Sequence, residues 1–182
     1  FGRDVLDQRL PREARKRLTY EHDHSLLESF EDLVESKLHK SRTLILLRHA
    51  KALPREGYTG GDLNRPLSGA GQDRAKSLIP LLSAFGIRRI VTSPAVRCTQ
   101  TVDPFAGISG ALVELDDRLI ESTRASQVNR AMDSLLTGKA PTVACSHRPT
   151  MPEIYAALGI TGPVLSPGQA LVLHHRKGRV HA

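Results

Sequence analysis

Three short apolar runs are each followed closely by arginine or histidine. The runs lie at residues 43–47, 89–92 and 142–145, and the basic residues that follow them are Arg48, His49, Arg97, His147 and Arg148. If the runs are buried strands of one α/β sheet, ligands are expected in the crevice beyond their carboxyl ends. Arginine is well shaped to hold phosphate by paired hydrogen bonds. The sequence therefore predicts an anion pocket that contains two histidines.

Other phosphate chemistries lack their motifs in this chain. A P-loop needs Gly-x-x-x-x-Gly-Lys-Ser/Thr, and Gly138-Lys139 is followed by alanine. A cysteine phosphatase needs arginine at the sixth position after its cysteine, where Cys98 has proline and Cys145 has methionine. The nearest metal-like cluster, His-Asp-His at residues 22–24, is expected to cap a helix instead. What remains is metal-free phosphoryl transfer centred on a histidine, with no cofactor.

Apolar runs alternate with helical stretches from residue 43 onwards. Strands are expected at residues 43–47, 89–92, 112–115, 142–145 and 170–173, and helices at residues 68–85, 94–105, 125–136 and 152–158. The first run is apolar throughout, which is typical of a strand buried on both faces. The alternation indicates an α/β protein, a three-layer α/β/α sandwich with a mainly parallel central sheet.

Residues 1–42 differ from the rest and are expected to form a separate N-terminal segment. Apolar residues between Leu26 and Leu38 follow helical spacing, and Asp23 or Ser25 is expected to cap this helix. One amphipathic helix makes no core of its own, so the segment must dock on the domain at residues 43–182 or on a missing one. The chain begins without methionine, which is consistent with a fragment of a longer protein.

The charge of the chain points to an anionic partner. Of 182 residues, 26 are Lys or Arg and 19 are Asp or Glu, a net charge of +7, and the nine basic and nine acidic residues of positions 1–42 cancel. The excess therefore lies in residues 43–182, which suits a phosphorylated metabolite, a nucleic acid or an acidic protein surface. Aromatic residues make up only 4%, which disfavours direct nucleic-acid binding by base stacking.

The composition also bears on location. No apolar stretch approaches the roughly 20 residues that span a bilayer, so a transmembrane protein is excluded and no membrane partner is expected. The first four residues lack the layout of a signal peptide. Cys98 and Cys145 make no disulfide framework and are interpreted as reduced thiols, which predicts a cytoplasmic protein.

The residues at the strand ends resemble the motifs of the histidine phosphatase superfamily. These motifs are Leu47-Arg48-His49-Ala50, Arg97 within residues 92–101, Glu121 in Leu119-Ile120-Glu121, and His147 in Cys145-Ser146-His147-Arg148. The usual family core is Arg-His-Gly. Alanine at position 50, residues 64–68 and Gly71 are similar to the branch that contains the phosphohistidine phosphatase SixA. The resemblance covers residues 43–176 and implies a phosphoglycerate-mutase-like fold.

The resemblance implies a phosphohistidine intermediate and a role for each residue. His49 is the nucleophile and attacks through a neutral imidazole nitrogen, a state that nearby positive charges favour. Its second nitrogen needs an acceptor, for which a backbone carbonyl is expected. Arg48, Arg97 and His147 hold the phosphoryl oxygens. Glu121 is the general acid and then the general base.

Three further residues are candidates for substrate binding. Ser68 either contacts the phosphate or is the N-cap of the helix that follows it. Lys51 and Arg148 lie beside the core motifs and are expected to help select an anionic substrate.

The N-terminal segment carries a second resemblance, to the tail of a MutT-like Nudix domain. It rests on Leu10-Pro11, Ala14, residues 18–20, Asp23, residues 26–27 and Phe30. In some bacterial proteins such a domain precedes a histidine phosphatase domain. The resemblance implies a phosphatase that removes a terminal phosphate from a nucleotide, such as a nucleoside diphosphate, as the partner of a Nudix hydrolase.

Two alternatives stay open. A SixA-like enzyme would act on phosphohistidine in a protein. A non-catalytic anion-binding domain would regulate or position a Nudix partner, although the presence of both His49 and Glu121 argues against it. Phosphoglycerate mutase activity is disfavoured, because His49 is followed by Ala-Lys-Ala-Leu-Pro and the chain leaves little room for a capping insertion.

Overall fold

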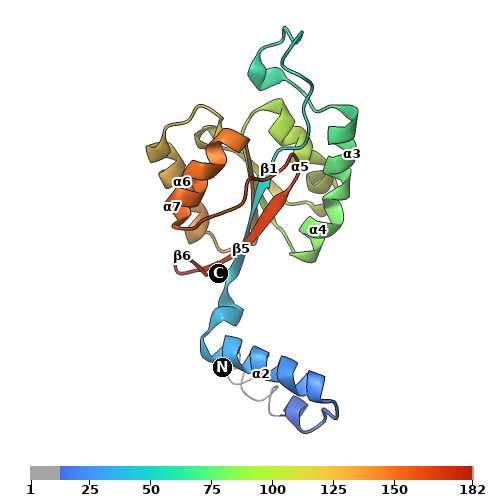
Figure 1. The fold of residues 1–182 in the computed structure, drawn as a ribbon, viewed down its shortest axis with the longest axis vertical. Helices are drawn as coiled ribbons and strands as arrows, with labels where there is room; N and C mark the ends of the chain where they lie inside the picture. The colour runs from blue at the N-terminus through green and yellow to red at the C-terminus, as the bar shows by residue number, and fades with distance from the viewer. Residues whose placement is uncertain (1–12, 182) are drawn as a thin grey trace. The chain divides into compact units, whose positions relative to one another are not determined.

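The computed structural model describes residues 13–181. The chain divides into two compact units between Ser41 and Arg42, and the second unit carries the sheet (Figure 1). Leu10 and Pro11, on which part of the Nudix resemblance rests, lie outside the described residues. The origin of the first unit in a Nudix domain stays a prediction.

In the first unit, helix α2 spans Glu21–Glu35 and a 3-10 turn follows at Leu38–Lys40. The expected capping by Asp23 or Ser25 is wrong, because the helix begins before both residues and its N-cap is Tyr20, which makes no side-chain cap. The His-Asp-His run at residues 22–24 lies inside the helix for the same reason, and the Ser25 hydroxyl donates to the His22 carbonyl at 2.7 Å. Asp23 instead places negative charge in the first turn, where the helix dipole favours it.

The second unit is built on a six-stranded sheet. Its strands are β1 (Arg42–Arg48), β2 (Arg89–Thr92), β3 (Leu112–Leu115), β4 (Thr142–Ser146), β5 (Ala170–Arg176) and β6 (Arg179–His181). Their order across the sheet is β3-β2-β4-β1-β5-β6. The pairs β1–β4, β2–β4 and β2–β3 are parallel, whereas β1–β5 and β5–β6 are antiparallel. The sheet is therefore mostly parallel, as predicted.

The hairpin at the end of the chain differs from the expectation. Strand β5 runs to Arg176 rather than ending at residue 173, and β6 was not predicted at all. Lys177 and Gly178 join the two strands with positive φ angles of 50° and 76°, the geometry of a two-residue hairpin turn. Because β6 has only three residues, one of them apolar, its sequence carries no strand pattern.

Helices cover both faces of this sheet (Figure 1). One layer holds α3 (Gly69–Ser77), α4 (Ile79–Ala84) and α5 (Val96–Ser109), and the other holds α6 (Ala125–Thr137) and α7 (Met151–Leu158).

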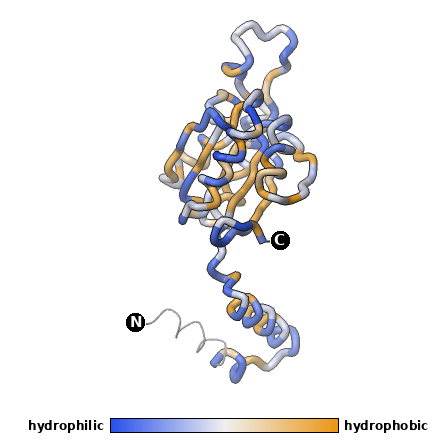
Figure 2. Tube along the Cα trace, turned by 90° about the vertical axis from the view of Figure 1, so that its left-hand side faces the viewer, coloured by the Kyte–Doolittle hydropathy of each residue, from blue (hydrophilic) through white to orange (hydrophobic). Residues whose placement is uncertain are grey.

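Strand β1 contributes to two hydrophobic cores. Leu44 and Leu46 pack in the core with residues of α6 and α7, whereas Ile45 and Leu47 pack in the core with residues of α4 and α5. Successive side chains of a strand point to opposite faces, so an apolar run fills both cores. Figure 2 shows these apolar stretches running through the interior of the unit. The predicted three-layer α/β/α sandwich is confirmed.

Two helices differ from their predicted bounds. The stretch expected as one helix at residues 68–85 is two, separated at Leu78, because Pro80 has no N–H to donate into the preceding turn. Helix α5 continues past Pro104 and ends at Gly110, whose φ of 64° is left-handed. None of the helices within residues 13–181 has the length and apolar character to cross a membrane.

Candidate active site

The carboxyl ends of β1 and β4 bring the two histidines together. These neighbouring strands are parallel and in register, with Arg48 opposite Ser146. The His49 backbone N–H donates to the Ser146 carbonyl at 3.0 Å. The His49 and His147 rings meet edge to face with centroids 5.2 Å apart. The sheet therefore places both histidines at one rim, as predicted.

His49 is held in one orientation and in its neutral form. Its Nδ1 lies 2.7 Å from the carbonyl oxygen of Ala50, so Nδ1 carries the hydrogen and Nε2 keeps its lone pair. This confirms the predicted backbone acceptor. Burial is the main cause that lowers the pKa of His49 to about 4, and the charges of His147, Arg97 and Arg48 lower it further. Burial thus contributes more than the arginines from which the neutral state was predicted.

Arg48 and Arg97 each have a buried Nε donor without a partner among the described residues. Arg97 is fully buried in the first turn of α5, and Arg48 donates from Nη1 to the Leu165 carbonyl at 2.7 Å. Within the described residues, no acceptor lies in hydrogen-bond range of Nε of Arg48 or Nε of Arg97. A buried donor without an acceptor is costly. Two such donors at the strand ends beside a histidine favour an anionic ligand there.

Glu121 follows the 3-10 turn at Asp117–Leu119 and lies between two arginines. Its Oε1 accepts from Arg55 Nη2 at 2.8 Å, and its Oε2 accepts from Arg97 Nη2 at 3.0 Å. The same Oε2 is 3.9 Å from His147 Nδ1. Partial burial acts to raise the pKa of Glu121, but the hydrogen bond and positive charge of Arg55, together with His147 and Arg97, outweigh it and lower the pKa. The carboxyl group is therefore ionised near neutral pH.

His147 is buried and contacts side chains that follow β2 and lie in α5. Its Nε2 is 2.9 Å from the Ser93 hydroxyl and 3.6 Å from Cys98 Sγ. Cys98 and Cys145 are both free and buried, in line with the expected reduced thiols. His147 thus has its ring fixed beside His49.

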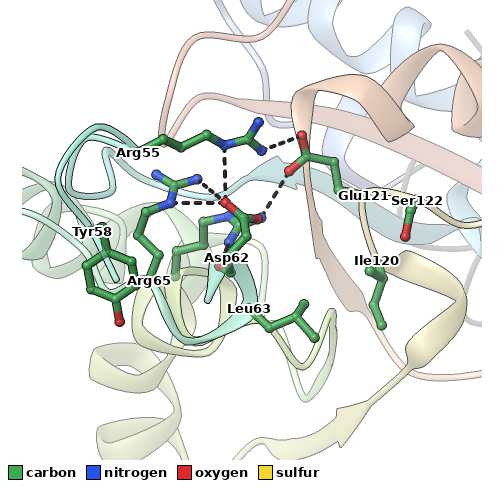
Figure 3. A pocket seen from close by; sticks show the side chains of 9 residues that line it. Arg55, Tyr58, Asp62, Leu63, Arg65, Ile120, Glu121 and Ser122 are labelled. Carbon is green, nitrogen blue, oxygen red and sulfur yellow. Dashed lines mark hydrogen bonds and ion pairs between the residues drawn. The ribbon is translucent and has the colours of Figure 1, made fainter. Parts of the chain in front are cut away.

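Three site residues were missed by the sequence analysis: Arg55, Asp62 and Arg65. Asp62 lies at their centre, as Figure 3 shows. Its carboxylate accepts from Arg65 Nη2 at 3.0 Å and Arg97 Nη2 at 2.8 Å, and it pairs with Arg55 Nε at 3.1 Å. These residues come from the loop between β1 and α3, where no strand end marks them. The available signal was the similarity of residues 64–68 to the SixA branch, which named no function for Arg65.

Two neighbouring cavities surround this cluster. The cavity over His49 has a volume of about 400 Å³ and is also lined by Arg48, Lys51, Glu121 and Arg148. A cavity of about 550 Å³ adjoins it, with Arg97 in its wall, and shares Arg55, Arg65 and Glu121 with it. The predicted residues thus line these two adjoining cavities, except for His147 and Ser68. His147 lies in neither wall, although its ring touches His49.

Ser68 is the second exception. Of its two expected roles, phosphate contact or helix cap, it has the second, because it is the N-cap of α3. Its hydroxyl accepts from the Gly71 backbone N–H at 3.2 Å and donates to the Lys51 carbonyl at 3.0 Å. The first contact caps α3 and the second joins the cap to the loop after β1, so a phosphate contact by Ser68 has no support in the structure. No three His, Cys, Asp or Glu side chains in residues 13–181 are grouped as metal ligands.

Comparison with known proteins supports this fold. A model of the histidine phosphatase superfamily (branch 1) matches residues 44–126, which include Arg48, His49, Arg97 and Glu121. The structure of the protein histidine phosphatase SixA complexed with tungstate has a TM-score of 0.65 at 21% identity, over 76% of this chain and 92% of that chain. A mycobacterial glucosyl-3-phosphoglycerate phosphatase has a TM-score of 0.64 at 17% identity, over 77% and 96%.

A curated relative is also similar in sequence. It is an 8-oxo-(d)GTP phosphatase from Mycolicibacterium smegmatis, 33% identical over 96 residues. The match covers 53% of this chain and 30% of the relative, so the chain matches less than a third of that protein's length.

Proposed function

We propose that the chain is a member of the histidine phosphatase superfamily, whose model matches residues 44–126, and that it releases phosphate through a phosphohistidine formed on His49. One observation supports this proposal more strongly than any other. The Ala50 carbonyl holds Nδ1–H of His49, which leaves Nε2 as an unprotonated nucleophile beside two buried arginine donors that lack partners.

In the first step, the lone pair of His49 Nε2 attacks phosphorus and forms a P–N bond. The bond from phosphorus to the leaving oxygen breaks, and that oxygen takes a proton from the protonated form of Glu121, which is the minor form near neutral pH. Arg48, Arg97 and His147 hold the phosphoryl oxygens, over which negative charge spreads during transfer. In this proposal the positive charge comes from the two arginines rather than from a metal ion.

In the second step, water attacks phosphorus and the P–N bond breaks. The water gives its proton to the Glu121 carboxylate, so the carboxyl group is protonated again, and the bonding electrons return to His49 Nε2. The Nδ1–H bond to the Ala50 carbonyl is kept throughout. Glu121 lies 3.9 Å from His147 Nδ1, which keeps it near the phosphoryl site for both steps.

The substrate proposed is a nucleotide with a terminal phosphate, such as a nucleoside diphosphate. The cavity over His49 is lined by Lys51, Arg55, Arg65 and Arg148 in addition to Arg48, more positive charge than one phosphate needs. The 8-oxo-(d)GTP phosphatase relative supports the same class. A Nudix partner for this chain rests on the N-terminal resemblance and is part of the same proposal.

A protein phosphohistidine is the second candidate substrate. The observation that favours it is the alanine at position 50 after His49, together with the likeness in fold to SixA. A small arginine-rich cavity would accept a phosphoryl group from a protein side chain as well as from a nucleotide.

The experiment compares phosphate release by the wild-type chain and by His49→Ala. Turnover of p-nitrophenyl phosphate by the wild type alone supports a catalytic domain that uses His49. No release above background by either protein would leave an anion-binding domain, and equal turnover by both would reject His49 as the nucleophile. Nucleoside diphosphates, monophosphates and a phosphohistidine peptide are then ranked by kcat/KM. A ranking led by the peptide would replace the nucleotide proposal with the second candidate.

A further inference from the structure

Arg55 links two carboxylates that belong to different parts of the second unit. Its Nη2 donates to Glu121 Oε1 at 2.8 Å, and its Nε lies 3.1 Å from Asp62 Oδ1. The Arg55 side chain is 63% exposed and borders both cavities. Figure 3 shows it reaching across the pocket towards Glu121.

Arg55 is the partner that can leave this cluster. The Arg97 side chain is fully buried and the Arg65 side chain is 10% exposed, so both are fixed by packing. Asp62 keeps hydrogen bonds from Arg65 and Arg97 without Arg55, and Glu121 keeps its bond from Arg97. Because exposed ion pairs contribute little to stability, Arg55 can exchange its carboxylate partners for another anion at small cost.

The cavity has more positive charge than a single phosphoryl group uses. The proposed reaction places one phosphoryl group against Arg48, Arg97 and His147. Lys51, Arg55 and Arg148 line the same cavity and have no part in that step. Arg55 is the one of these three that already holds a site carboxylate, with two donor nitrogens in use. The fork geometry of arginine suits a phosphate as well as it suits two carboxylates.

We propose that Arg55 is a specificity-determining residue that holds the Glu121 carboxylate in the structure described here and exchanges it for a second phosphate group of the substrate. This inference rests on the proposed phosphatase function and deepens it, since it makes a diphosphate the preferred substrate. A substrate with a single phosphate leaves Arg55 on Glu121. A diphosphate draws Arg55 away.

The exchange also changes the readiness of Glu121 to give a proton. Arg55 acts to lower the pKa of Glu121, so its departure raises that pKa and favours the protonated acid that the leaving oxygen needs. The other groups that face Glu121 stay in place: Arg97 from α5, His147 after β4, and Arg48, His49, Lys51, Arg65 and Arg148 around the cavity. A diphosphate substrate thereby favours the protonated form of Glu121, which its own hydrolysis needs.

The first test measures binding rather than turnover. Calorimetry compares methylenediphosphonate with inorganic phosphate, using the wild-type chain, Arg55→Gln, Arg55→Lys and the control Arg130→Gln. Arg130 is an exposed residue of α6, outside both cavities. Arg55→Gln is expected to weaken diphosphonate binding about tenfold, the effect of roughly one charge-assisted hydrogen bond, and to leave phosphate binding within about twofold. Arg55→Lys is expected to lie between, and Arg130→Gln to match the wild type. Equal weakening of both ligands, or no change in either, would overturn the inference.

The second test follows the pH profile of kcat/KM for β-glycerophosphate, whose leaving group needs a proton. The wild-type rate falls as pH rises through the pKa of Glu121, and Arg55→Gln is expected to move this fall to higher pH. A fall at the same pH in both proteins would contradict the link between Arg55 and Glu121. Absence of turnover of p-nitrophenyl phosphate by the wild type would reject the proposed function instead, while the calorimetry would still decide whether Arg55 reads a second phosphate.

Discussion

Asp62 binds the buried guanidinium group of Arg97 through both its side chain and its backbone. The Asp62 carboxylate accepts from Nη2 at 2.8 Å, and the Asp62 backbone carbonyl accepts from Nη1 at 2.6 Å. Nε of Arg97 is left without an acceptor among the described residues. A loop residue therefore determines which edge of the arginine remains available to a phosphoryl oxygen.

Replacement of Asp62 is expected to impair catalysis through Arg97. Asp62→Ala removes the carboxylate but keeps the backbone carbonyl, so the guanidinium loses one of its three hydrogen bonds to Asp62 and Glu121. The misplaced arginine is expected to lower kcat by about ten- to a hundredfold. Unfolding free energy is expected to fall by about 1–3 kcal/mol, since a hydrogen bond between two charged groups is lost while Nη2 of Arg97 keeps Glu121 as its acceptor. Steady-state kinetics and urea denaturation measure the two effects. Asp62→Asn keeps an acceptor and should lie between; a kcat equal to wild type in Asp62→Ala would remove Asp62 from this role.

His49 is expected to stay neutral over the whole physiological range. Its pKa of about 4 lies below the ordinary value of 6.5, so between these values the unfolded chain binds more protons than the folded one. The free energy of unfolding should therefore rise with pH from about 4 to about 6.5 and be lost again on acidification through that window. Histidine NMR titration and denaturation at several pH values check this. His49→Gln should show a smaller slope, and a His49 midpoint near 6.5 would contradict the burial argument.

Glu121→Gln is expected to let the phosphoenzyme accumulate. Glutamine neither protonates a leaving oxygen nor accepts a proton from water, so a substrate with a good leaving group still transfers its phosphoryl group, but hydrolysis is slow. Rapid quench should place the label on the peptide that contains His49, and brief acid treatment should remove it because P–N bonds are acid-labile. An acid-stable label, or a burst of leaving group without any label, would point to direct attack by water.

Activity is expected to persist in excess chelator. Arg48 and Arg97 supply positive charge around the proposed phosphoryl site, which is the role that a divalent ion has in other phosphatases. The measurement is p-nitrophenyl phosphate turnover before and after dialysis against EDTA. Loss of activity that magnesium restores would overturn the prediction.

The sheet unit is expected to fold without residues 1–40. The core residues of this unit all lie in the second compact unit, which begins at Arg42. A chain truncated at residue 40 should keep its Tm within a few degrees of the full chain and keep its turnover. An insoluble product would show that α2 is needed for the core of the sheet unit.

The sequence by itself determined which basic residues lie at the carboxyl rim of the sheet. Residues 43–47 are apolar on both faces, so this strand had to lie inside a sandwich, and Arg48 and His49 directly after it had to reach the carboxyl edge. The same reasoning placed His147 after β4. These inferences succeed because a strand end is a local feature, determined by short-range hydrophobic pattern.

Only the tertiary structure decided how the rim is completed. Arg55, Asp62 and Arg65 lie in a loop without hydrophobic period, and their contacts with Arg97 and Glu121 join residues that are far apart in the chain. Which carboxylate faces which arginine depends on how that loop folds over the sheet. The choice of Ser68 between a phosphate contact and a helix cap, and the pairing of β6, were decided in the same way, since each depends on partners that the local sequence does not specify.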